Sequence, residues 1–134
     1  LGLKPALSFH SKVVHVQHLA VGEAIGYGST YVTDRPMTIA TIPVGYADGY
    51  PRSLSNRGSV LIHGKRCSIV GRVCMDQLMV AMPEGVDVQP GDAVILLGKQ
   101  GNESITALEL ATLVGTIPYE IFCDISERVP RIYV

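Results

Sequence analysis

The chain has 134 residues, of which 47% are hydrophobic and 17% are charged, and its formal net charge is -1. This length and composition predict one folded domain, residues 1–134, and exclude disorder. The charge balance excludes a basic nucleic-acid footprint, and no apolar run approaches the roughly 18 residues of a membrane span.

Short apolar runs rich in Val and Ile, separated by turn residues, predict an all-β domain. His63-Gly64 predicts a two-residue hairpin turn, and Gln89-Pro90-Gly91-Asp92 predicts a second turn. Frequent turns between short strands indicate a barrel or a sandwich, and we expect a closed or partly open, Greek-key-like β-barrel. The predicted strands are Val13–Val16, Met37–Val44, Val60–Ile62, Ile69–Val73, Leu78–Met82, Ala93–Leu97, Tyr119–Ile125 and Arg131–Val134.

One segment predicts a short α-helix over residues 106–114. Thr106 and Glu109 form a capping-box pattern, in which each side chain would bind the other residue's backbone amide. Strong helix formers fill 107–114, and Gly115 follows where a helix C-cap belongs.

The histidines and cysteines predict no metal site. If residues 12–16 form a strand, alternation places His10 and His18 on the face opposite His15. The three cysteines are an odd number without C-x-x-C spacing, which predicts reduced thiols in the cytoplasm. The N-terminal LGLKPALSF has neither a starting Met nor a signal pattern, so we interpret Leu1 as lying at a domain boundary.

Tyrosines set among glycines are the least ordinary feature of the sequence. They occur in the segments 26–31 (GYGSTY) and 45–52 (GYADGYPR), the second directly after an apolar strand. Glycine lets a backbone approach a ligand closely, and loops at strand ends often bind ligands. Turns whose tyrosines cover the barrel ends are the plainer interpretation.

A third cluster, residues 71–77 (GRVCMDQ), places Arg72 and Asp76 beside apolar residues. Charged side chains are rarely buried without partners. The cluster therefore indicates either a solvent-facing bend with Arg72 and Asp76 as neighbours, or a strand rim facing a polar site.

Taken in order, several segments resemble the C-terminal domain of alanine racemases. Together they extend over almost the whole chain. They are Lys4-Pro5-Ala6-Leu7-Ser8, residues 27–31 (YGSTY), 45–50 (GYADGY), 70–77 (VGRVCMDQ), 116–120 (TIPYE) and 128–131 (RVPR). Two small departures are Pro118, where relatives often have Asn, and Tyr50, where some have Trp.

The resemblance implies a pyridoxal-phosphate enzyme that interconverts L-alanine and D-alanine for peptidoglycan synthesis. Such an enzyme has an N-terminal (β/α)8 barrel, absent from this chain, whose lysine holds the cofactor as a Schiff base. The family works as a head-to-tail homodimer whose active sites combine one subunit's barrel with the other's C-terminal domain. We therefore expect the 134-residue chain alone to be inactive.

The resemblance also implies roles for individual residues. Tyr27 matches the catalytic base that acts on L-alanine. Met75 and Asp76 match substrate-site residues, with the Met75 backbone amide meeting the substrate carboxylate, and Tyr119 matches a residue that reaches the cofactor phosphate. The residues matching the entrance passage are Tyr46, Arg52, Arg72 and Ile117.

A tyrosine base needs help, because a free phenol titrates near ~10 and no cation is adjacent to Tyr27 in sequence. Three alternatives share some of these features. A racemase acting on serine or another amino acid would have the same motifs, and a pyridoxal-phosphate decarboxylase should lack the motif at 27–31. A non-catalytic β-barrel interaction module would show no dependence on the cofactor.

Overall fold

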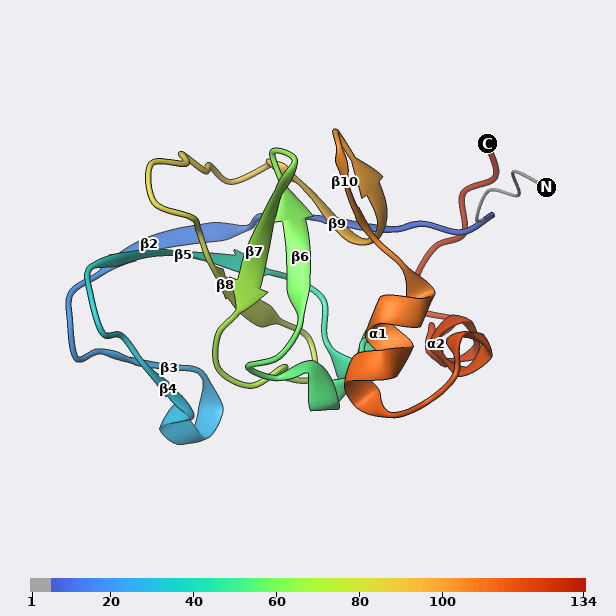
Figure 1. Ribbon diagram of the computed structural model, residues 1–134, viewed down its shortest axis with the longest axis horizontal. Helices are drawn as coiled ribbons and strands as arrows, with labels where there is room; N and C mark the ends of the chain where they lie inside the picture. Colours follow the sequence, from blue (N-terminus) through green and yellow to red (C-terminus); the bar gives the residue numbers. More distant parts are fainter. Residues whose placement is uncertain (1–5) are drawn as a thin grey trace.

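The computed structural model describes residues 6–134, except for the side chain of Tyr27. The Lys4-Pro5 part of the first resemblance segment lies outside these residues. The described chain is mostly antiparallel sheet, with two α-helices near its C-terminus (Figure 1). No helix in this range is both long enough and apolar enough to cross a bilayer.

Seven strands pair in the order β1-β9-β6-β7-β8-β5-β2, with β10 paired to the far end of β9. A separate hairpin of β3 and β4 lies at the end of the molecule opposite the α-helices (Figure 1). The strands are β1 (Phe9–Lys12), β2 (His15–Leu19), β3 (Ala24–Ile25), β4 (Tyr31–Val32), β5 (Met37–Ile42), β6 (Ser59–Ile62), β7 (Lys65–Ile69), β8 (Leu78–Ala81), β9 (Ala93–Gln100) and β10 (Glu103–Ile105).

The sheet must curl, because its two outer strands are consecutive in the chain. β1 and β2 are separated only by Val13 and Val14, which span roughly 10 Å at most. Seven flat strands would place the outer two roughly 29 Å apart at normal strand spacing. The Val13 amide donates to the Asp92 carbonyl beside β9, and the Val14 amide donates to the Thr41 carbonyl in β5, both at 2.9 Å. The predicted all-β, partly open barrel is thereby confirmed.

Two apolar clusters stabilise this barrel. The larger one fills the interior and includes Ala40 and Ile42 of β5. The smaller one lies on the other face of β5, where Ile39 and Met37 pack with Ile25 and other residues. β5 is therefore buried on both faces, which explains why apolar residues occur at both alternating sets of its positions.

The predicted helix is confirmed as α1 (Ala107–Val114), which ends at Gly115 in the left-handed conformation. The Thr106 hydroxyl caps it by accepting from the Glu109 amide at 3.1 Å. The reciprocal half of the capping box is not formed. The Glu109 carboxylate binds the Arg66 guanidinium instead, at 2.7 and 2.8 Å.

The predicted strand Tyr119–Ile125 is wrong, because this segment forms a second helix, α2 (Pro118–Asp124), packed beside α1. Pro118 starts the helix at a position where its missing amide proton is not needed. Ile121 and Ile125, four residues apart, are both buried, which is the spacing of one helical face. The β-branched and aromatic composition favoured a strand, and packing against α1 overrode it.

Three other strand predictions need correction. Arg131–Val134 contains no strand, because the Arg131 guanidinium donates to carbonyls of Ile125, Ser126 and Val129 and folds the segment onto the end of α2. The strand predicted at Ile69–Val73 is also wrong beyond its first residue, since β7 ends at Ile69. The predicted strand at 13–16 is interrupted at Val13-Val14, where the chain changes edges.

Candidate functional site

The first tyrosine-glycine motif (residues 26–31) forms a tight turn between β3 and β4. Tyr27–Ser29 make a 3-10 turn, η1, flanked by Gly26 (φ 77°) and containing Gly28 (φ 79°). Both glycines have φ values that side chains disfavour. A β-carbon on Gly28 would lie 3.2 Å from Cζ of Arg72. The guanidinium of Arg72 therefore lies directly beside the residue that follows Tyr27.

Asn56 ties this turn to the 70–77 segment. Its side-chain amide donates to the Thr30 hydroxyl at 3.1 Å, and its side-chain oxygen accepts from the Gly71 amide at 2.6 Å. Its own backbone amide donates to the Gly71 carbonyl at 3.2 Å. One polar side chain thus fixes two motifs that are about 40 positions apart in the sequence.

The turn of the second motif (residues 45–52) packs directly against the backbone of the third (residues 71–77). After β5, η2 (Tyr46–Asp48) brings the Tyr46 amide 3.0 Å from the Cys74 carbonyl and the Ala47 amide 3.0 Å from the Met75 carbonyl. A β-carbon on Gly45 would lie 2.1 Å from the Cys74 carbonyl oxygen. Position 45 therefore accepts only glycine without a backbone shift.

Arg128 joins both of these loops to the C-terminal segment. Its Nε lies 2.9 Å from Oδ1 of Asp48, and its terminal nitrogen Nη2 lies 2.7 Å from Oδ1 of Asp76. Asp48 is buried, and its other oxygen accepts from the Gly45 amide at 2.9 Å. The hydrogen bond with Asp76 and the charge of Asp48 raise the pKa of Arg128. Among residues 6–134, the ion-pair partner of Asp76 is thus Arg128 and not Arg72.

The segments that hold the predicted site residues are η1, η2, residues 52–54, residues 70–77 and the start of α2, and they run along the lower edge of the molecule in Figure 1. Four of them are large apolar or aromatic side chains exposed to solvent: Tyr46 (43%), Met75 (52%), Ile117 (58%) and Tyr119 (77%). Backbone hydrogen bonds bring Tyr46 to Met75, and Arg72 lies against η1. Among residues 6–134, no hydrogen bond or ion pair joins Ile117, Tyr119 or Arg52, which lies in η3 (Arg52–Leu54), to the Met75 loop.

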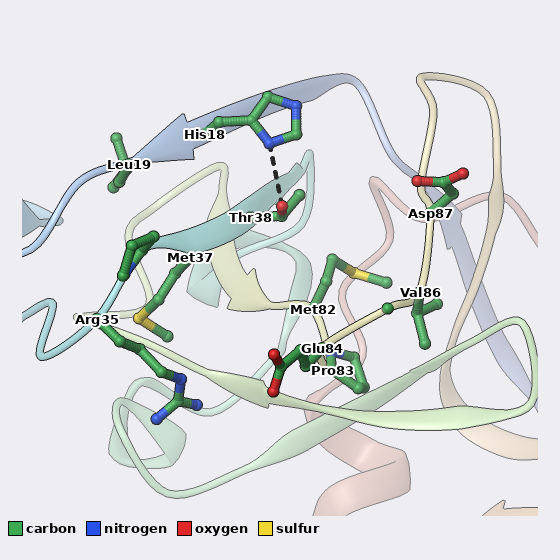
Figure 2. A pocket seen from close by; sticks show the side chains of 12 residues that line it. His18, Leu19, Arg35, Met37, Thr38, Met82, Pro83, Glu84, Val86 and Asp87 are labelled. Atoms are coloured by element: carbon green, nitrogen blue, oxygen red, sulfur yellow. Dashed lines mark hydrogen bonds between the residues drawn. The ribbon is translucent and has the colours of Figure 1, made fainter.

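A hollow of about 260 Å³ lies beside Arg72, the one predicted site residue that lines it. It is lined by Gly26, Arg72, Cys74, Gln77, Leu78 and Met79. A larger hollow of about 520 Å³ lies elsewhere, between β2, β5 and the loop that follows β8 (Figure 2). His18 at its rim pairs with the Thr38 hydroxyl at 3.0 Å, and no predicted site residue lines it.

Two buried groups have strongly raised pKa values. Burial raises the pKa of the Cys67 thiol to about 11. Burial, reinforced by the charge of Glu109, raises the pKa of Tyr50, whose hydroxyl has no hydrogen-bond partner among the described atoms. Tyr50 is therefore a core residue of the GYADGY motif rather than an acid or base. Within residues 6–134, no three His, Cys, Asp or Glu side chains cluster as metal ligands would.

Sequence reasoning assigned no role to Asn56, Asp48 or Arg128. Arg128 belonged to a resemblance segment, and Asp48 to the tyrosine-glycine motif, but their pairing crosses 80 positions of sequence. Asn56 lies outside every motif that was recognised. The only local signal was that each is a polar residue beside turn residues, which is typical of most loops.

The fold and these loops define a class: a β-barrel domain that presents glycine-shaped aromatic and charged loops along one exposed edge. Comparison with known proteins identifies the family. The family described as "Alanine racemase, C-terminal domain" matches residues 6–133. The alanine racemases of Carboxydothermus hydrogenoformans and Symbiobacterium thermophilum are 62% and 58% identical over 98% of this chain.

Solved structures agree with the sequence relatives. Alanine racemase from E. faecalis superimposes with a TM-score of 0.94 at 51% identity over 100% of this chain, which covers 35% of that structure. The Bacillus anthracis enzyme with bound L-Ala-P gives 0.95 at 48% identity, covering 100% of this chain and 34% of that one. Alanine racemase from Bartonella henselae with covalently bound pyridoxal phosphate gives 0.88 at 36%, covering 95% and 34%.

The chain therefore belongs to the family of alanine racemase C-terminal domains. It spans 36% and 35% of the lengths of the two sequence relatives.

Proposed function

We propose that this domain is part of a pyridoxal-phosphate-dependent alanine racemase that interconverts L-alanine and D-alanine. In this proposal the enzyme is a homodimer, and the domain supplies Tyr27 to the active site of the partner subunit. The bound L-Ala-P of the Bacillus anthracis relative supports alanine as the substrate, and the bound pyridoxal phosphate of the Bartonella henselae relative supports the cofactor.

The convergence of three motifs on one edge is the observation that supports this proposal most strongly. Asn56 links the turn of Tyr27 to Gly71, and Gly45 allows the turn of Tyr46 to approach the backbone of Met75. Loops held this closely are suited to a preorganised site.

We propose that Arg72 assists the base, because the fold brings its guanidinium to the η1 turn. Arg72 lies against Gly28, one residue after Tyr27, although it is 45 positions away in sequence. A positive charge close to a phenol favours its ionised form. We infer that the Tyr27 phenolic oxygen takes the α-proton of L-alanine and returns a proton in the reverse direction.

Other residues would bind the substrate and touch the cofactor. The Met75 amide donates none of the hydrogen bonds found among residues 6–134, so it suits the substrate carboxylate, with Asp76 beside it. Tyr119, 77% exposed in the first turn of α2, presents a hydroxyl that fits a contact to a phosphate oxygen. When bound, pyridoxal phosphate supplies an electron sink for the charge left at the α-carbon.

The remaining residues would surround the route to the site. Ile117 and Tyr46 are exposed and Arg72 is half-buried, so together they could form the wall of a passage once another domain covers the edge. Arg52, exposed in η3, would add a positive charge that attracts the carboxylate of an amino acid. Three free cysteines support a reducing compartment, the cytoplasm, where D-alanine is made for peptidoglycan.

Substitution of Tyr27 tests the proposal. In the complete enzyme, Tyr27→Phe removes one hydroxyl from a turn, so the fold should persist while racemisation falls by about 10²- to 10⁴-fold, as expected for loss of a general base. Solvent deuterium should enter the α-carbon much more slowly from L-alanine than from D-alanine.

Tyr31→Phe is the matched control. The Tyr31 hydroxyl lies 3.7 Å from the Met37 sulfur, so it is engaged in packing and should be dispensable for the rate. If Tyr27→Phe exchanges the α-proton of L-alanine at the wild-type rate, Tyr27 is not the base.

A further inference from the structure

Arg128 is placed to set the geometry of two loops that it does not belong to. One edge of its guanidinium faces two carboxylates from different parts of the chain, Asp48 at 2.9 Å and Asp76 at 2.7 Å. Asp48 lies in the turn of Tyr46, and Asp76 follows Met75 directly. The residue therefore spans the same two loops that the Gly45 close approach brings together.

The two ends of this bridge differ in rigidity. Asp48 is buried, its carboxylate also accepts from the Gly45 amide, and its carbonyl accepts from the Ser126 amide at 3.0 Å. The Asp76 side chain is 61% exposed, and Arg128 is its hydrogen-bond partner among the described residues. Arg128 thus extends from a fixed anchor to a loop that would otherwise be held only at its backbone.

The bridge contributes more to position than to stability. Half of the Arg128 side chain is exposed, and ion pairs in such surroundings typically contribute little to folding. The planar guanidinium fork, however, fixes the directions of both carboxylates, which a flexible ammonium group cannot do. Small displacements of substrate-binding groups can change rates by up to about 100-fold.

We propose that Arg128 is a positioning residue for substrate binding: by bridging Asp48 and Asp76 it holds the Met75-Asp76 loop at the spacing that receives the substrate carboxylate. The proposal rests on the proposed function, because it takes Met75 and Asp76 as substrate-site residues. Arg128 itself touches no reacting atom and acts through Asp76.

The test uses the complete racemase with Arg128→Lys and Arg128→Ala. KM for alanine should rise roughly tenfold or more in both, with Lys retaining the charge but not the fork. The midpoint of thermal unfolding should change little in Arg128→Lys, which keeps a positive charge beside the buried Asp48. In both variants kcat should fall less than KM rises. If Arg128→Ala does not fold, the KM of Arg128→Lys alone tests the proposal.

A double-substitution cycle separates positioning from general destabilisation. Asp76→Asn removes the exposed half of the bridge, and the double variant Asp76→Asn/Arg128→Lys should raise KM no further than the worse single substitution. Arg35→Ala is the control, since within the described part of the chain Arg35 pairs only with its neighbour Asp34, at 3.4 Å. It should leave KM unchanged.

Two results would overturn the proposal: a KM within twofold of wild type in Arg128→Lys, or effects of Arg128→Lys and Asp76→Asn on KM that multiply independently. Failure of the wild-type enzyme to racemise alanine would instead refute the proposed function. The two failures are therefore distinguishable.

Discussion

At the scale of single residues, the structure separates tyrosines and cysteines that look alike in sequence. Tyr46 and Tyr50 belong to one motif, yet Tyr46 is exposed in a turn and Tyr50 is 2% exposed in the core. The difference arises because Gly49, in the left-handed conformation, turns the chain inward at a point where the Asp124 backbone leaves no space for a β-carbon. The motif at residues 45–50 therefore contains one tyrosine exposed to solvent and one tyrosine that packs in the core.

The cysteines should differ in reactivity for the same reason. Cys67 is fully buried in β7 with its pKa raised to about 11, so thiolate is scarce at neutral pH and reagents cannot reach it. Cys123 is exposed on α2. In the 134-residue chain, a thiol reagent at about pH 8 should modify Cys123 and spare Cys67, as located by peptide mass spectrometry.

Denaturant provides the control for this measurement. Unfolding should make Cys67 react, and Cys123→Ser should remove the fastest phase in the folded chain, leaving the half-buried Cys74 as the more reactive of the two remaining thiols. Equal labelling rates for the two thiols in the folded chain would contradict the buried position of Cys67.

At the scale of elements, the turn before β9 combines a backbone hydrogen bond with an ion pair. The Asp92 carboxylate accepts from the Gln89 amide at 2.9 Å and lies 2.8 Å from Nε2 of His63, in the β6–β7 hairpin turn. The Gln89 hydrogen bond, and then the His63 hydrogen bond, lower the pKa of Asp92. The carboxylate therefore joins two turns that both lie at the ends of barrel strands.

This lowered pKa predicts an acid-dependent stability. A carboxyl group that is more acidic in the folded state stabilises the fold above its unfolded pKa, and the contribution disappears as pH falls through the folded pKa. The free energy of unfolding should therefore be higher for wild type than for Asp92→Asn at about pH 6, and the difference should vanish toward about pH 2. Urea denaturation across this range measures it.

Asp34→Asn is a suitable control for the acid series. Asp34 is 73% exposed, and among residues 6–134 it pairs only with Arg35. Exposed ion pairs contribute little. Its substitution should leave the free energy of unfolding nearly unchanged at pH 6. A difference between wild type and Asp92→Asn that is constant with pH would show that the carboxylate charge is not what stabilises these turns.

Elements with strong local signals could be predicted from the sequence, and elements fixed by distant contacts could not. The hairpin at His63-Gly64 was predicted, and both residues have positive φ values (53° and 70°) that such turns require. α1 was predicted from its cap and its C-terminal glycine. By contrast, α2 has no side-chain cap, and its apolar run fits a strand as well as a helix until α1 is beside it.

In the candidate site, too, features with local sequence signals could be predicted and features fixed by distant contacts could not. The tyrosine-glycine turns were identified because glycine and tyrosine are conspicuous in sequence. The links through Asn56 and Arg128 were not, because hydrogen bonds between loops 15 to 80 residues apart depend on the completed barrel. The sequence thus indicates the turns that carry the candidate site residues, but not Asn56 and Arg128, which fix the positions of those turns.

At the scale of the whole molecule, four of the exposed large apolar or aromatic side chains belong to the segments of the proposed site. Tyr46, Met75, Ile117 and Tyr119 are each at least 43% exposed. Apolar groups gathered in this way mark interaction surfaces, and in the proposed dimer the partner subunit would cover them. The 134-residue chain should consequently associate weakly or be sparingly soluble on its own.

Met75→Arg tests whether this edge is an interface. Met75 is 52% exposed and its side chain is not part of either apolar cluster, so the substituted 134-residue chain should fold normally by circular dichroism. In the complete enzyme, a long charged side chain would be forced into a closed contact, at a cost of roughly 2 kcal/mol or more in association. Sedimentation should show weaker dimerisation, and racemisation should be lost.

Leu108→Arg is the matched control, because Leu108 is an apolar side chain of α1 that is 63% exposed and belongs to no proposed site. Both variants introduce one arginine in place of one exposed apolar residue, so solubility and net charge change equally. Only Met75→Arg should impair the dimer and the activity, because in the proposed dimer Met75, and not Leu108, faces the partner subunit. A Met75→Arg enzyme that dimerises and racemises as well as the Leu108→Arg enzyme would show that this edge does not close on the partner subunit. Met75 would then have to be removed from the proposed substrate site.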